Sequence, residues 1–67
     1  MKNYIKKLRK EKRITQEELA ERCKVTRQTI ISLENERYNP SIFLAYKIAK
    51  VFGMTIEQVF IFEEGEQ

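Results

Sequence analysis

Apolar residues recur along this chain at spacings of three and four, which is the period of helices that bury one face. The pattern predicts helices over residues 4–12, from Thr15, over 27 to about 35, over 42–52, and from Thr55 through 59 and 60. The residues expected to face the core are Ile5, Leu8, Leu19, Ala20, Cys23, Ile30, Leu33, Phe52, Ile56 and Val59. The chain is therefore predicted to be all-α.

Capping residues mark where the predicted helices begin. In chain order, the expected N-caps are Asn3, Thr15, Thr26, Ser41 and Thr55. Glu18 and Gln58 stand three residues after a threonine, so two of these caps are predicted to be capping boxes. Gly53 stands where a left-handed residue is expected after the fourth helix.

The composition fits one small domain over residues 1–67 and argues against catalysis. The chain is 42% hydrophobic and 34% charged, and histidine, the commonest general base, is absent. Its one cysteine, Cys23, excludes an intramolecular disulfide, and its place on an inward stripe favours a core residue over a redox switch. No apolar run approaches the roughly 20 residues that span a bilayer. We expect a cytoplasmic binding module that is not an enzyme and has no cofactor, metal, membrane contact or small-molecule ligand.

Charge is divided unevenly along the chain. Residues 1–37 hold eleven of the thirteen basic residues and six of the ten acidic ones, whereas residues 38–67 hold two and four. This division suggests that the first part meets a polyanion and the second part meets protein. A basic helix face that is merely solvated explains Lys6, Lys7, Lys10, Lys12 and Arg13 equally well, so charge alone does not decide.

The second and third predicted helices are joined by about three residues, which is the layout of a helix-turn-helix over residues 15–35. In such a unit the second helix enters the major groove of DNA. Side chains on its outer side are the candidate base contacts, namely Arg27, Gln28, Ile31 and Ser32. Arginine pairs with guanine, glutamine with adenine, and an apolar side chain meets a thymine methyl. For Ile31, a side chain that is exposed or partly packed is a better-supported interpretation than a base contact.

Candidate phosphate contacts lie beside this helix. Thr15 and Gln16 bring free backbone N–H groups and an amide to the start of the second helix, where a phosphate fits. Thr15 and Thr26 are helix caps first, so any phosphate contact by their hydroxyls is secondary. Tyr38 either contacts a phosphate or covers the edge of the core, and the pattern does not choose.

The stretch ITQEELAERCKVTRQTIISLENERYNPS, followed by LAYKIAKVFG, resembles the Cro/C1-type (Xre-like) helix-turn-helix transcriptional regulators, and the resemblance covers about residues 3–62. It implies a five-helix, lambda-repressor-like DNA-binding domain, a homodimer and a roughly palindromic operator in double-stranded DNA. By position, it implies phosphate contacts at Gln16, Asn35 and Arg37 and groove-facing positions at Arg27, Gln28, Thr29 and Ser32. It also implies a structural ion pair between Arg9 and Glu34.

The chain departs from the family pattern at three positions. Lys24 and Glu36 stand where the family commonly has glycine, and Phe43 stands where it often has a polar residue. A lysine held in a left-handed conformation costs about 1–2 kcal/mol, so either the turn geometry shifts slightly or Lys24 tolerates the strain. A carboxylate at Glu36 beside phosphates is expected to weaken binding.

The last third of the chain carries more large apolar residues than a small core can bury. We expect an exposed patch and a dimer interface within residues 43–63, formed by Phe43, Tyr46, Phe60, Ile61 and Phe62. Some short family members pair their terminal segments, so residues 1–3 and 61–63 are candidates for a short β-ribbon.

Two functions follow from these observations. The favoured one is a homodimeric, sequence-specific DNA-binding regulator, more often a repressor, that acts by occupying its operator. The alternative is an antitoxin-like or adaptor module whose apolar C-terminal patch binds a different protein partner.

Overall fold

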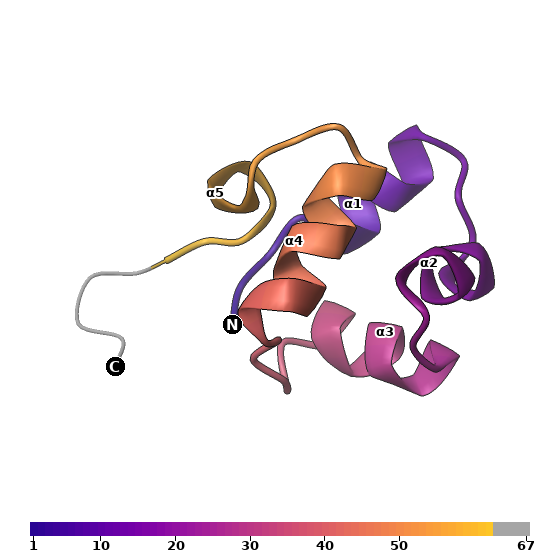
Figure 1. The fold of residues 1–67 in the computed structure, drawn as a ribbon, viewed down its shortest axis with the longest axis horizontal. Coiled ribbons are helices and arrows are strands. Elements are labelled where there is room, and N and C mark those ends of the chain that lie inside the picture. Colours follow the sequence, from indigo (N-terminus) through magenta and orange to yellow (C-terminus); the bar gives the residue numbers. More distant parts are fainter. Residues whose placement is uncertain (63–67) are drawn as a thin grey trace.

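The computed structural model describes residues 1–62 of the 67-residue chain. Its helices are α1 (Ile5–Glu11), α2 (Gln16–Cys23), α3 (Arg27–Glu34), α4 (Ile42–Val51) and α5 (Ile56–Val59). α2 packs against α3 and α4, α5 packs against α4, and α1 packs against α3. Figure 1 shows α2 and α3 at one end of the molecule and α5 at the other. The part of the chain that the structure describes holds no sheet, so the predicted all-α fold is confirmed.

The predicted caps begin four of the helices. The hydroxyl oxygens of Thr15, Thr26, Ser41 and Thr55 each accept a hydrogen bond from the backbone N–H three residues later. Glu18 and Gln58 complete the two capping boxes by accepting from the backbone N–H of the cap residue. Gly53 follows α4 with φ of 68°, which is the left-handed conformation expected of it. The local sequence thus sets these helix boundaries.

The start of α1 differs from its prediction. Its N-cap is Tyr4, whose side chain caps nothing, whereas Asn3 lies one residue earlier. The Asn3 Oδ1 still accepts a hydrogen bond from the Ile5 N–H at 3.1 Å. Its Nδ2 donates to the carbonyl oxygen of Leu33 at 2.8 Å, so the same amide joins the start of α1 to the end of α3. Because a residue of α3 takes part, the pattern of α1 alone does not anticipate this geometry.

The core is built from the inward faces of all five helices. Its buried apolar residues are Ile5, Leu8, Ile14, Leu19, Ala20, Cys23, Ile30, Leu33, Leu44, Ala45, Ile48, Ala49, Phe52, Val59 and Phe60. Of the residues predicted to face inward, only Ile56 is absent from this set, and it packs against the core half-buried. Each large aliphatic side chain buried in this way contributes about 1.5–3 kcal/mol. None of the described helices is long and apolar enough to cross a bilayer.

Cys23 lies within this core, with no exposed surface. Burial raises the pKa of its thiol above the ordinary value, and the charge of Lys47 opposes the rise. Only the thiolate reacts readily with oxidants. The thiol is therefore a core group, as predicted, and not a surface switch.

Phe60 is buried to 1% exposure, and its predicted place in an exposed dimer patch is wrong. α5 ends at Val59, and Phe60 takes an extended conformation with φ of −111° and ψ of 139°. In this conformation it forms an antiparallel bridge with Asn3. The N-terminal segment therefore holds Phe60 against the core, a contact between the two ends of the chain that helical spacing does not reveal.

The two terminal segments pair over only a few described residues. The Tyr4 N–H donates to the carbonyl oxygen of Val59 at 2.8 Å, and the Ile61 N–H donates to that of Lys2 at 2.9 Å. The candidate β-ribbon is reduced to these two bonds around a single bridge. Residue 63 of that prediction lies outside the described residues.

Within residues 1–62, three residues other than glycine adopt the left-handed conformation. Arg13, Lys24 and Glu36 have φ values of 56°, 57° and 62°. Lys24 and Glu36 are the positions where glycine is common in the family, so the turns keep their geometry and the residues bear the strain. Arg13, in the turn between α1 and α2, was not anticipated. Each such residue costs about 1–2 kcal/mol relative to a relaxed conformation.

Candidate nucleic-acid interface

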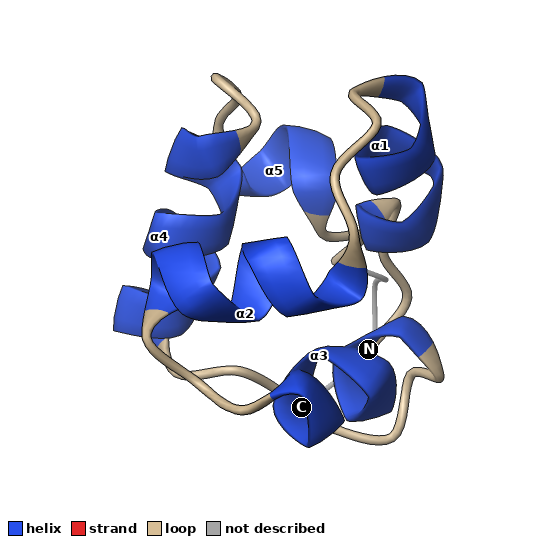
Figure 2. Cartoon of the chain, turned by 90° about the vertical axis from the view of Figure 1, so that its right-hand side faces the viewer, coloured by secondary structure: helices blue, strands red, loops and turns tan. Residues whose placement is uncertain are grey.

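α2 and α3 form a helix-turn-helix, with residues 24–26 as its turn. Lys24 ends α2 in the left-handed conformation, and the Val25 N–H closes the turn by donating to the carbonyl oxygen of Ala20 at 3.0 Å. The Thr26 hydroxyl oxygen then accepts from the Thr29 N–H and starts α3. Figure 2 shows α3 beneath α2 at the lower edge of the molecule. The turn thus leaves the outer side of α3 uncovered by α2.

The outer side of α3 carries the predicted base contacts. Ile30 and Leu33 are buried, whereas Arg27 and Gln28 in the first turn are exposed. The intermediate positions are Thr29, Ile31 and Ser32, which are half-buried. A shallow hollow beside the helix is lined by Thr26, Gln28, Thr29, Ser32 and Tyr38. The structure therefore brings together polar side chains that the sequence offered separately as base and phosphate contacts.

A chain of four side chains crosses from α1 to the first residue of α3. The Arg9 Nε lies 2.7 Å from Glu34 Oε2, which is the ion pair that the resemblance implied. The Gln16 Nε2 donates to Glu34 Oε1 at 3.0 Å, and the Arg27 Nε donates to Gln16 Oε1 at 3.4 Å. The side chains of Arg9 and Glu34 are 12% and 4% exposed, so the pair is largely shielded from water.

These side-chain hydrogen bonds determine the orientation of the Gln16 amide. A carboxylate only accepts, so the Gln16 NH₂ group must face Glu34, and the Gln16 oxygen is left to face Arg27. The Arg27 guanidinium is thereby held by one of its five N–H groups, while the others donate to no described residue. Sequence reasoning named Gln16 and Arg27 but missed their contact, because helix phase does not specify which side chains meet between helices.

The residues after α3 place polar groups at its C-terminal end. Asn35 is the C-cap, and the Arg37 N–H donates to the carbonyl oxygen of Ser32 at 3.0 Å. Asn35, Glu36 and Arg37 are all exposed. The left-handed Glu36 therefore puts a carboxylate between the two residues predicted to contact phosphates.

Comparison with known proteins agrees with this geometry. The sequence matches the helix-turn-helix family over residues 5–59. The chain belongs to this family, the Cro/C1-type helix-turn-helix transcriptional regulators. Over 66 residues it is 54% identical to an HTH-type transcriptional regulator of Archaeoglobus fulgidus, covering 98% of this chain and 93% of that protein. Over 66 residues it is 52% identical to an HTH-type regulator of Methanocaldococcus jannaschii, covering 98% and 100%.

A phage protein is a more distant relative. The immunity repressor protein of Bacillus phage phi105 is 34% identical over 55 residues, covering 82% of this chain and 38% of the phage protein. The similarity thus extends to a protein that carries the name of repressor.

A second, larger hollow lies beside the helix-turn-helix. It has a volume of about 730 Å³ and is lined by Arg9, Lys10, Arg13, Ile14, Thr15, Gln16, Glu17 and Arg27. The Thr15 hydroxyl oxygen on its wall accepts the capping bond from the Glu18 N–H at 3.0 Å. From the sequence, Lys10 and Arg13 belonged either to a part of the chain that meets a polyanion or to a merely solvated helix face, and they were not named as phosphate contacts. The run of basic residues in 6–13 could have indicated an anion-binding surface. Which of these residues lie beside the start of α2 depends on the geometry of the α1–α2 turn.

One face of α4 in this helix-turn-helix chain is apolar and exposed. Ile42, Phe43 and Tyr46 are 66%, 76% and 54% exposed, and Tyr46 follows Ile42 by four residues and Phe43 by three, so it lies beside both on the helix surface. Phe62, in the predicted dimer region, is 60% exposed, and Ile61 is half-buried. Ile42 was missed because it is the first residue of its helix, where the inward stripe is not yet defined.

Proposed function

We propose that this helix-turn-helix regulator binds a specific site in double-stranded DNA as a homodimer and represses transcription by occupying that site. The carrying observation is the first turn of α3, where exposed Arg27 is held by Gln16 and exposed Gln28 stands beside it. Side chains with guanidinium and amide groups are the ones that read guanine and adenine in the major groove. A held arginine loses less freedom on binding than a free one.

Phosphate contacts flank this reading surface in the proposal. Thr15 and Gln16 at the start of α2 hold one DNA strand, and Asn35, Arg37 and Tyr38 after α3 hold the other. Thr26 adds its hydroxyl at the start of α3. Phosphate contacts at both ends of α3 fix its register in the groove. Base contacts by Gln28, Thr29, Ile31 and Ser32 give the preference for one DNA sequence over another.

The homodimer forms in the proposal through the exposed face of α4 and the segment after α5. Ile42, Phe43, Tyr46 and Phe62 supply exposed apolar surface, and Ile61 lies at its edge. A two-fold pair sets the two copies of α3 about 34 Å apart, one turn of DNA, and requires a palindromic site. Phe60 is a buried core residue beneath this surface, so it does not itself contact the second copy in the proposal.

Selection of the purified protein against random duplex DNA at near-physiological salt, followed by sequencing, tests this proposal. The expected result is a two-fold symmetric motif whose half-sites lie about one helical turn apart. A transcription assay with that motif over a promoter then distinguishes repression from activation. Salt-sensitive binding without any enriched motif would contradict sequence-specific regulation.

The exposed α4 face supports a second candidate, an antitoxin-like or adaptor module that binds another protein. In that case an apolar partner covers Ile42, Phe43 and Tyr46 in place of a second copy. The two candidates differ in solution mass. A chain that stays monomeric at concentrations where it binds DNA favours a protein partner, and a dimer favours the regulator.

A further inference from the structure

The residues that line the hollow between α1 and α2 carry more positive charge than the neighbouring carboxylates neutralise. Among its lining residues, Arg9 is neutralised by Glu34. Among the described residues, Lys10 and Arg13, both exposed, form no ion pair, and the hydrogen bond of the Arg27 side chain goes to the neutral Gln16 amide. The hollow's own carboxylate is Glu17, also exposed. Three cations therefore face one carboxylate, an excess that favours an anion.

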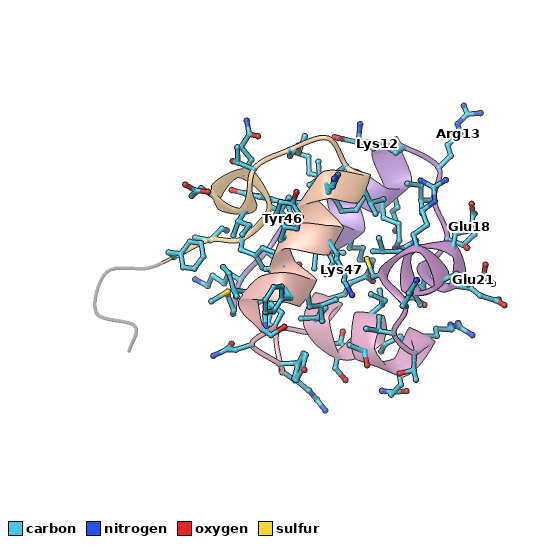
Figure 3. All side chains as sticks on the ribbon, in the orientation of Figure 1. Lys12, Arg13, Glu18, Glu21, Tyr46 and Lys47 are labelled. Carbon is cyan, nitrogen blue, oxygen red and sulfur yellow. The ribbon has the colours of Figure 1, made fainter. Side chains whose placement is uncertain are left out.

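Arg13 is an unfavourable residue for its backbone position. It holds φ of 56°, where glycine is favoured, and its side chain lies outside the core. Figure 3 shows Arg13 extending away from the ribbon at the turn that follows α1. The Arg13 side chain thus adds no core packing that would offset the backbone strain. Strain of this kind in a charged, exposed residue is a reason to look for a function.

The position of the hollow identifies the anion. Its walls include Gln16 and Arg27, the residues of the proposed phosphate and base contacts. A DNA strand held at the start of α2 continues past this point with one charge about every 3.4 Å. The hollow is open to solvent and adjoins the first turn of α2, so the strand meets it without moving the helices.

We infer that Lys10 and Arg13 extend the DNA contact beyond the helix-turn-helix by binding the phosphates next to those held at the start of α2. This inference rests on the proposed DNA-binding function. Both residues are positioning residues that add affinity without reading sequence. The left-handed conformation of Arg13 lowers the stability of the fold, and in this inference the phosphate contact is the reason that arginine stands there.

Titration of a mixed-sequence duplex, about two helical turns long, over a range of salt concentrations tests the inference by fluorescence anisotropy. Arg13→Gly removes the charge and relieves the strain. It is expected to weaken binding about three- to tenfold at low salt and to lower the salt slope by about 0.9. The same variant is expected to melt at a higher temperature than the wild type. Lys10→Ala is expected to lower the slope similarly, and Arg13→Lys to keep it.

Lys12→Ala is the matched control, because Lys12 is exposed and adjacent in sequence but does not line the hollow. It is expected to leave the slope unchanged. Equal losses for Lys12→Ala and Arg13→Gly would overturn the inference, since overall charge would then be responsible. Wild-type binding by Arg13→Gly, while Arg37→Ala loses affinity, would overturn it and leave the proposed function intact. No binding of the duplex by the wild type would overturn both.

Discussion

The Arg9 guanidinium lies against the Glu34 carboxylate, with Nε 2.7 Å from Oε2 and Nη2 3.3 Å from Oε1. This fork joins α1 to the last residue of α3. The two residues are 25 positions apart in the sequence, so the spacing within a single helix does not reveal the pair. Arg9 also donates to the carbonyl oxygen of Ile14 at 3.1 Å. One residue of α1 therefore steadies both the turn before α2 and the end of the proposed recognition helix.

Removing Arg9 is expected to cost more stability than removing the whole pair. Arg9→Ala leaves the shielded Glu34 carboxylate without its cation, which we expect to lower the free energy of unfolding by about 3 kcal/mol. Arg9→Met combined with Glu34→Leu leaves no uncompensated charge, and we expect it to be less destabilised than Arg9→Ala. Urea unfolding of the single and double variants measures both values. A double variant weaker than Arg9→Ala would contradict this account of the pair.

Replacing Lys24 by glycine is expected to stabilise the fold. Lys24 holds φ of 57° at the end of α2, and glycine adopts this conformation without a Cβ clash. After the entropy cost of glycine in the unfolded chain, the net gain is about 0.5–1 kcal/mol. Thermal and urea unfolding check it. Lys24→Ala keeps the Cβ and serves as the control, and an equal gain for alanine would rule out backbone strain as the cause.

Gln28 is expected to read one base in each half-site. Gln28→Ala removes a side chain from the exposed first turn of α3 and leaves the core untouched. We expect a loss of about 1–3 kcal/mol at one base position and little change in non-specific affinity. Binding to a set of operators that vary at each position measures the effect. The same loss on every sequence would instead assign Gln28 to the DNA backbone.

Phe43 is expected to support the proposed dimer. It is 76% exposed on α4, so Phe43→Ser removes apolar surface without opening the core. We expect the dimer to weaken by about 1–3 kcal/mol, with the melting temperature of the monomer unchanged. Sedimentation over a range of protein concentrations measures the association. Tyr4→Ser, which removes an aromatic ring that is 46% exposed on another surface, is the control. Unchanged association of Phe43→Ser would argue against this face.

Cys23 is expected to make stability fall at alkaline pH. Burial raises the pKa of its thiol above the ordinary value of 9.0. The unfolded chain therefore loses this proton at a lower pH than the folded chain does. The thiol's contribution to stability is complete below about pH 9 and is lost as the pH rises through the folded pKa. Urea unfolding at several pH values is expected to show a steeper decline for the wild type than for Cys23→Ala, and parallel declines would refute it.

Local chemistry let the sequence determine most of the fold. A hydroxyl at the N-cap and a carboxylate or amide three residues later act within one helical turn, so Thr15 and Thr55 mark their helices in any context. The three- and four-residue spacing likewise identified the buried faces, including Cys23 and Leu33. The resemblance to a family supplied the pairing of Arg9 with Glu34, which spacing alone does not contain.

The tertiary structure decided what depends on distant parts of the chain. Phe60 is buried because Asn3 pairs with its extended backbone, and the Asn3 amide is shared between α1 and α3. Gln16 meets Arg27 only because α2 and α3 are packed at a particular angle. Periodicity reports which face of a helix is apolar, but contacts between helices depend on how those faces are oriented in space. The sequence therefore determined where the helices lie and what they bury, and the packing decided which polar side chains meet.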